Sequence, residues 1–155
     1  MKGLLMKELS PNSMFNRATI LTLLQRADGT IPVPPAAREN AGVRFLVVAN
    51  FHDADLLAVN MSERYGRPHV AVTVDFSRGD ASQFKNGYRQ FVLRFTDVRN
   101  FVMPKFNSAM WIRDVWVEQR GDRIVTEWQL TYFVGNEPRY YTLTIDCGGV
   151  EVAAM

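Results

Sequence analysis

Hydrophobic and polar residues alternate along several stretches of the chain beyond residue 69. In residues 70–76 the larger apolar side chains occupy every second position, and residues 91–96 and 141–147 repeat this pattern. Successive side chains of a β-strand point to opposite faces of a sheet, so each stretch can bury one face and expose the other. The pattern predicts three half-buried strands over these ranges.

Two further stretches, residues 111–118 and 124–134, carry large apolar residues on both faces. Trp111 and Trp116 have opposite parity, so a regular strand would point one of them away from the core. Trp128 and Phe133 likewise have opposite parity, so one of them would also point away from the core. We expect the sheet to be covered on both faces, by the N-terminal segment or by a partner, with an exposed aromatic patch as the alternative.

Glycine-containing turns separate these stretches. Residues 120–122 and 135–138 lie between neighbouring strands, and Gly148-Gly149 predicts a tight hairpin turn between residues 145 and 152. Short strands at such spacing are typical of an antiparallel meander. We therefore predict a mainly β fold (α+β possible), forming a sandwich or half-barrel. Helix is limited to a turn or two at residues 35–40 and 81–86.

The N-terminal part differs in composition from the rest. Three of the seven prolines lie within residues 28–35, which indicates an extended loop because proline lacks an amide donor and has a restricted φ. Residues 14–27 fit a strand or a helix, and the Asp28-Gly29 turn slightly favours a strand. We predict a single domain over residues 1–155, with an N-terminal segment at 1–42 and an antiparallel β core at 43–155.

Composition and charge narrow the class of protein. The formal net charge of +2 supplies no overall field for binding nucleic acid or an acidic membrane. The one cysteine excludes an internal disulfide and fits a reducing compartment. No stretch resembles a signal peptide or approaches the roughly 20 apolar residues of a membrane span. The expected location is the cytoplasm, with no cofactor, no metal and no nucleic-acid or membrane partner.

A polar cluster follows the apolar run at residues 43–48. His52, Asp53 and Asp55, together with the other histidine, His69, could bind a metal or act in general base catalysis. We favour a structural role, in which Asp53 or Asp55 holds a turn and His52 packs at the strand entry. Cys147 shares the apolar face of its stretch, which indicates a buried, inert thiol.

The aromatic stretches supply a second candidate site. Trp111, Trp116 and Phe133 with Arg113 have the composition of protein-interface hot spots. These four residues are our candidate partner-binding set. The basic residues between positions 64 and 99 are interspersed with acidic ones, which favours a solvated mixed surface.

Short motifs resemble small bacterial domains of the polymorphic-toxin immunity type and their uncharacterised relatives. The likeness rests on a strand entry at residues 51–56, FHDADL, the strand at 70–76, and a later stretch at 91–98, FVLRFTDV. It covers residues 45–155 and implies a β-rich, non-enzymatic domain that binds a partner protein, without catalytic residues. The slightly basic net charge departs from the acidic character of many such domains.

These observations favour a non-enzymatic cytoplasmic domain that binds a protein partner or forms a homo-oligomer. A metal-dependent or His/Asp-based enzyme and a structural subunit of a larger assembly are the alternatives. We assign no catalytic residue.

Overall fold

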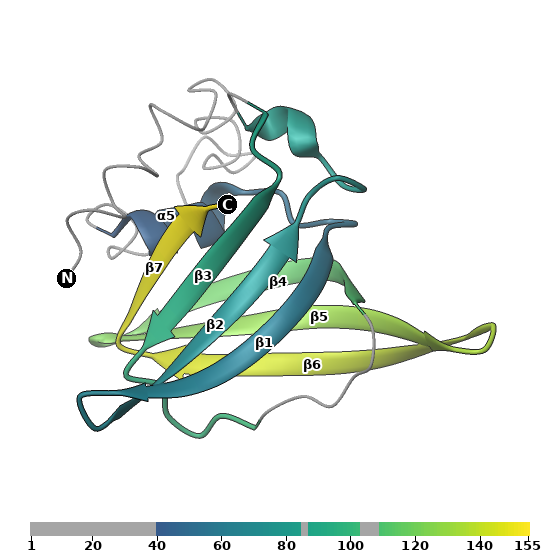
Figure 1. Ribbon diagram of the computed structural model, residues 1–155. Helices are drawn as coiled ribbons and strands as arrows, with labels where there is room; N and C mark the ends of the chain where they lie inside the picture. Colours follow the sequence, from purple (N-terminus) through teal and green to yellow (C-terminus); the bar gives the residue numbers. More distant parts are fainter. Residues whose placement is uncertain (1–39, 85–86, 103–108) are drawn as a thin grey trace, which may run out of the picture.

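The computed structural model describes residues 40–84, 87–102 and 109–155. Within them, one α-helix precedes seven antiparallel strands that form one open sheet in the order β6-β5-β4-β1-β2-β3-β7 (Figure 1). The elements are α5 (Ala41–Val48), β1 (Asp55–Arg64), β2 (Arg67–Asp75), a 3-10 helix η1 (Ala81–Gln83), β3 (Gln90–Thr96), β4 (Met110–Arg120), β5 (Arg123–Val134), β6 (Glu137–Cys147) and β7 (Gly149–Ala154). The predicted antiparallel, mainly β fold is confirmed. The proline-rich loop and residues 14–27 lie outside the described residues.

The sheet consists of two meanders that meet at one corner. β1, β2 and β3 form the first, and β4, β5 and β6 the second. β1 and β4 pair only through Asp55 with Trp111 and Leu56 with Met110. Beyond that point the strands separate, and the second meander runs across the first at a clear angle (Figure 1). Within the second meander, Gly121 lies in the turn between β4 and β5, and its φ of 62° is a backbone conformation that glycine adopts more readily than other residues.

The prediction of a hairpin at Gly148-Gly149 is wrong. β6 and β7 lie at opposite edges of the sheet, and β7 pairs with β3 instead. The N–H group of Gly148 donates to the carbonyl of Thr96, at 2.8 Å, so the chain bends here and crosses to the other meander. The glycine pair correctly indicated a change of chain direction at this point. The partner of the next strand, β3, is set by contacts between distant segments, which the local sequence does not indicate.

Residues 43–48, which we assigned to the β core, form most of helix α5. The side chain of Asn40 accepts a hydrogen bond from the N–H group of Val43, at 3.0 Å, and so caps the helix start. α5 packs against β7 and β4. A Cβ atom on Gly42 would lie 2.2 Å from the carbonyl oxygen of Val150, so only glycine permits this close approach of helix to strand. η1 confirms part of the helical turn predicted at residues 81–86.

The core lies on one face of the sheet, which we call the inner face. Its centre is a group of aromatic rings around Phe45, whose ring centroid lies 4.9 Å from that of Phe91. Trp128 is fully buried beside Phe51, and its Nε1 group donates to the hydroxyl of Thr126, at 3.0 Å. Fully burying one large apolar side chain contributes about 1.5–3 kcal/mol. The apolar faces predicted for residues 70–76, 91–96 and 141–147 point into this core.

Among the described residues, no helix has the length and apolar character needed to cross a membrane.

Candidate functional site

The outer face of β4, β5 and β6, which points away from the core, carries four exposed aromatic side chains. Trp111, Trp116, Phe133 and Tyr140 have 42, 63, 48 and 67% of their surface exposed. We call these four residues the aromatic patch. The described residues agree with the alternative of an exposed patch, whereas cover by the N-terminal segment or by a partner stays a prediction, because residues 1–39 lie outside the described residues.

A β-bulge places both tryptophans on the same face. The register of β4 against β5 shifts between Ile112 and Asp114, so β4 has one extra residue there. Trp111 lies opposite Thr131 and Trp116 opposite Glu127. Thr131 and Glu127 are four residues apart on β5, so their side chains lie on the same face of the sheet. The two tryptophans opposite them therefore lie on that face as well. Parity in a regular strand would place the two tryptophans on opposite faces, and the bulge reverses that prediction.

Contacts within the patch hold some of its rings in place without burying them. The rings of Trp111 and Phe133 meet edge to face, with centroids 5.2 Å apart. The guanidinium carbon of Arg113 lies 5.4 Å from the ring centroid of Tyr140. The structure thus gathers the predicted partner-binding residues on one face. It adds Tyr140, which sequence analysis did not include although its parity opposes the buried residues of β6.

Two carboxylates flank Trp116 on the outer face. Glu127 lies directly opposite Trp116 across the β4–β5 pair, and Asp114 precedes Trp116 on β4. Neither makes an ion pair within the described part of the chain. Asp114 accepts a hydrogen bond from the N–H group of Val115, at 2.8 Å, and Glu127 accepts one from Gln129, at 2.7 Å. The surface around Trp116 is therefore both apolar and negatively charged.

A second pair of carboxylates borders the patch on the side of β1. Asp55 lies opposite Trp111 on β4 and opposite Asp75 on β2. Burial raises the pKa of Asp55, whose side chain is only 13% exposed. The positive charge of Arg78, whose Nε lies 3.6 Å from the Asp55 carboxylate, lowers this pKa, and the negative charge of Asp75 raises it further. Burial also disfavours the charged form of Asp75, but hydrogen bonds, first from Ser77, lower its pKa overall.

His52 and Asp53 lie next to the patch, at the corner where β1 meets β4. The Nδ1 atom of His52 is 3.0 Å from the carbonyl oxygen of Arg113, and Asp53 donates its N–H group to Ile112. The turn is held by Asn50, whose side-chain oxygen accepts from the N–H group of His52, at 3.1 Å, and not by Asp53 or Asp55 as we expected. The polar cluster thus fastens the chain to the bulge of β4.

His69 does not join the other three residues of the polar cluster. It lies opposite Ser62, seven residues along β1 from Asp55. At about 3.3 Å per residue, this places it roughly 20 Å from the corner. Within the described ranges, no group of three or more His, Cys, Asp or Glu side chains could hold a metal ion. The geometry therefore offers no shared site for the two histidines.

The thiol of Cys147 is buried at the end of β6, as predicted. Burial raises its pKa to about 12. A thiol that stays protonated at neutral pH is a poor nucleophile, so Cys147 has the properties of a core residue.

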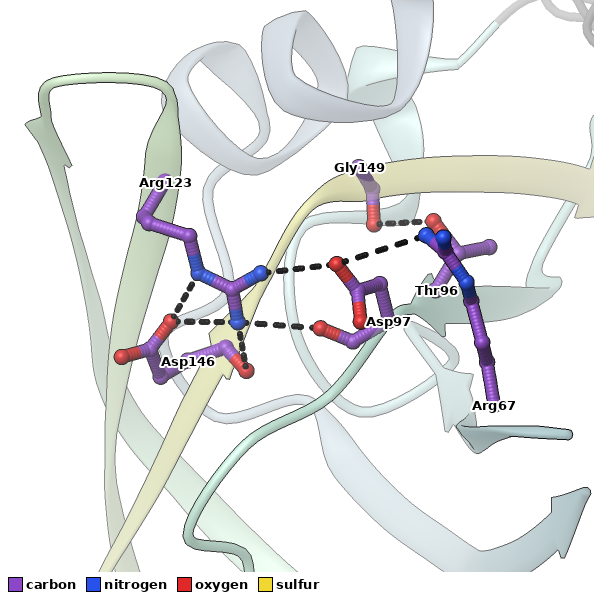
Figure 2. Close-up of polar contacts among 6 residues, drawn as sticks. All are labelled: Arg67, Thr96, Asp97, Arg123, Asp146 and Gly149. Carbon is purple, nitrogen blue, oxygen red and sulfur yellow. Dashed lines mark hydrogen bonds and ion pairs between the residues drawn. The ribbon is translucent and has the colours of Figure 1, made fainter.

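A charged cluster that the sequence pattern did not indicate lies at the bend between β6 and β7. The guanidinium of Arg123, at the start of β5, lies between Asp146 and Asp97 (Figure 2). Its Nε donates to Asp146 at 2.8 Å and its Nη1 to Asp97 at 3.0 Å, while Nη2 donates to the backbone oxygen of Asp97 at 2.9 Å. Arg67 approaches Asp97 at 3.8 Å. These bonds join β3, β5 and β6, which points to a structural role for the cluster.

Comparison of the chain with protein-family models, with curated proteins and with solved structures gives no match.

Proposed function

We propose that this chain is a non-enzymatic protein-binding domain, and that it recognises its partner through the outer face of β4, β5 and β6. The aromatic patch is the observation that carries the proposal. Trp and Tyr are enriched among residues that dominate binding energy, and the four exposed aromatic side chains share one face of the sheet. The patch lies on paired strands, so its side chains lose little backbone freedom when a partner binds.

The charges around the patch indicate the chemistry of the partner. Asp114 and Glu127 flank Trp116 and make no ion pair among the described residues. A lysine or arginine side chain of the partner would satisfy both carboxylates and could lie over the indole ring. We therefore expect the partner to present basic side chains next to apolar ones.

The resemblance to immunity-type domains supports the same class of function, because it implies binding to a protein. A toxin as the partner stays a prediction. An acidic patch on a slightly basic chain would allow such a domain to bind a basic partner locally despite its net charge.

The test compares three forms of the full chain as affinity bait in an extract of its source cells. Trp116→Ser removes one member of the patch, and Asn60→Ser changes an exposed residue on β1, in the other meander. Proteins bound to the unchanged chain are identified by mass spectrometry, purified and titrated against each form. We expect Trp116→Ser to weaken affinity by about 30-fold or more, the effect of a hot-spot residue, and Asn60→Ser to leave it unchanged.

Equal affinity for both variants would contradict the proposal. A loss of affinity in Trp116→Ser would support it only if circular dichroism and the unfolding midpoint stay the same. Raising the salt concentration should weaken binding, because Asp114 and Glu127 would then attract the partner less strongly.

A further inference from the structure

β6 forms one edge of the sheet, and among the described residues part of this edge has no strand beside it (Figure 1). In an antiparallel pair, alternate residues direct both backbone groups to the same neighbour. The carbonyl of Asp146 faces away from β5, because it accepts the N–H group of Arg99 at 2.9 Å. The β5–β6 register has no bulge, so Tyr140, Thr142 and Thr144 also direct their N–H and C=O groups outward.

The available part of this edge is bounded at both ends. Pro138 has no N–H group to offer, and Asp146 already pairs with Arg99. Between them, Tyr140, Thr142 and Thr144 are exposed and have no second strand within the described residues. Residues 140–145, YYTLTI, carry no charge. Natural proteins usually protect a sheet edge with charged residues, proline or a bulge, and this window has none of these.

The outward-facing residues of this window, Tyr140, Thr142 and Thr144, are evenly spaced about Thr142. A second copy of the same strand, running antiparallel, therefore matches the window. We propose that β6 pairs antiparallel with β6 of a second copy of this chain, with Thr142 opposite Thr142 of the partner subunit. Tyr140 then lies opposite Thr144 of the partner subunit, and Thr144 opposite the partner's Tyr140. Every outward-facing backbone group in both windows is used once, in roughly six hydrogen bonds. No like charges face each other in this register.

Other registers use the window less well. A two-fold axis at Tyr141 would place Thr144 opposite Pro138 of the partner subunit, and an axis at Leu143 would place Tyr140 opposite the partner's Asp146, whose carbonyl is already occupied. An axis at Tyr140 or Thr144 would set part of the window against the proline or against the occupied carbonyl of Asp146. Only the axis at Thr142 matches all three residues with their equivalents.

The pairing would join two patches into one surface. Within a copy, Tyr140 lies beside Thr131, which lies beside Trp111; Thr144 lies beside Glu127, which lies beside Trp116. With Tyr140 opposite Thr144 of the partner subunit, Trp111 of one copy and Trp116 of the other lie in the same cross-strand row. The proposed pairing of the two β6 strands does not depend on the proposed function. It would, however, double the outer-face surface that is available to a partner protein.

The first experiment measures the mass of the full chain in solution by sedimentation equilibrium over a range of concentrations. The chain has a mass of 17.7 kDa, and we expect a concentration-dependent species of twice that mass. Thr142→Lys would place two like charges on the axis and should shift the chain to monomer. Asn60→Lys adds the same charge on exposed β1 and should leave the dimer intact. A chain that stays monomeric at every soluble concentration, or a Thr142→Lys variant that still dimerises, would overturn the proposal.

The second experiment tests the register without weakening the edge. Residues opposite each other in a hydrogen-bonded pair have Cα atoms about 5.5 Å apart, within the range that a disulfide spans. Thr142→Cys should therefore cross-link in the presence of diamide, whereas Thr144→Cys, which faces Tyr140 of the partner subunit, should not. Buried Cys147 does not compete. Equal cross-linking of both variants, or of neither, would contradict this register. A monomeric variant that still binds a partner protein would leave the proposed function in place.

Discussion

The two meanders use their inner faces alike and their outer faces differently. Inside, both contribute buried aliphatic and aromatic residues to one core. Outside, the first meander carries small or polar residues, such as Asn60, Ala71 and Thr73. The second carries Trp111, Trp116, Phe133 and Tyr140, all exposed. Since the core accounts for the inner residues of both, the outer aromatic residues of the second meander need a different explanation.

This difference separates the demands of folding from those of binding. A sheet with one buried face needs alternation of apolar and polar residues, and the first meander keeps close to that pattern, with no exposed aromatic side chain in β1, β2 or β3. The second meander breaks it only on the outer face, without loss of packing on the inner one. Residues that break the local pattern where the fold does not need them are expected at functional sites.

The largest expected effect comes from removing one tryptophan from each face of the second meander. Trp128→Ala should lower the free energy of unfolding by about 3–5 kcal/mol, because it leaves a cavity in the core. Trp116→Ala should change it by less than about 0.5 kcal/mol, as at an ordinary exposed site. Denaturant unfolding followed by circular dichroism measures both. Similar losses in the two variants would mean that the outer face is packed after all.

The bend that joins the two meanders can be loosened at Arg123. Arg123→Met should lower the free energy of unfolding by about 3 kcal/mol, because Asp97 and Asp146 would lose their shared cation. Arg120→Met is the matched control, since the Arg120–Glu118 pair is exposed and screened by water, and its loss should leave the free energy of unfolding almost unchanged. If both variants cost the same, the Arg123 cluster would not be what holds the bend.

Alkaline pH tests the burial of the inner face at the end of β6. Cys147 has its pKa raised from 9.0 to about 12, so above pH 9 the unfolded chain loses the thiol proton while the folded chain keeps it. This contribution to stability is complete below pH 9 and is lost as the pH rises towards 12. One unit above pH 9 the loss should be about 1.4 kcal/mol. Cys147→Ala should lack this component in urea titrations. An identical decline in both forms would contradict the burial.

The smallest effect concerns the helix that packs on β7. Asn40→Ala should lower the free energy of unfolding by about 1 kcal/mol, because the N–H group of Val43 loses its capping oxygen. Asn60→Ala, at an exposed position of β1, should have almost no effect. Thermal unfolding of the two variants side by side measures the difference. A full-size effect from Asn60→Ala would show that the meanders differ less on their outer faces than the structure indicates.

The local pattern predicted the strands well because each strand buries one face. The alternation at residues 70–76, 91–96 and 141–147 follows directly from that burial. Helix α5 was missed because nearly all its residues are buried, so its apolar run lacks the polar face that distinguishes a helix from a buried strand.

Pairing between distant segments was beyond the sequence pattern. The bulge after Ile112 moves Trp116 to the face of Trp111, and no local signal marks it. The bend at Gly148 contains the residues of a hairpin turn, but the contacts of Gly148 with Thr96 and of Arg123 with Asp97 lead β7 to the other meander. The candidate residues of the patch could be named from the sequence, whereas their common face could not.

We propose above that the outer face of β4, β5 and β6 binds a protein partner. Isothermal titration of the purified partner with the unchanged chain and with Trp116→Ser tests it most directly. We predict that affinity falls by about 30-fold or more, while the free energy of unfolding of the variant stays within about 0.5 kcal/mol of the unchanged chain. Unchanged affinity with an intact fold would contradict the claim.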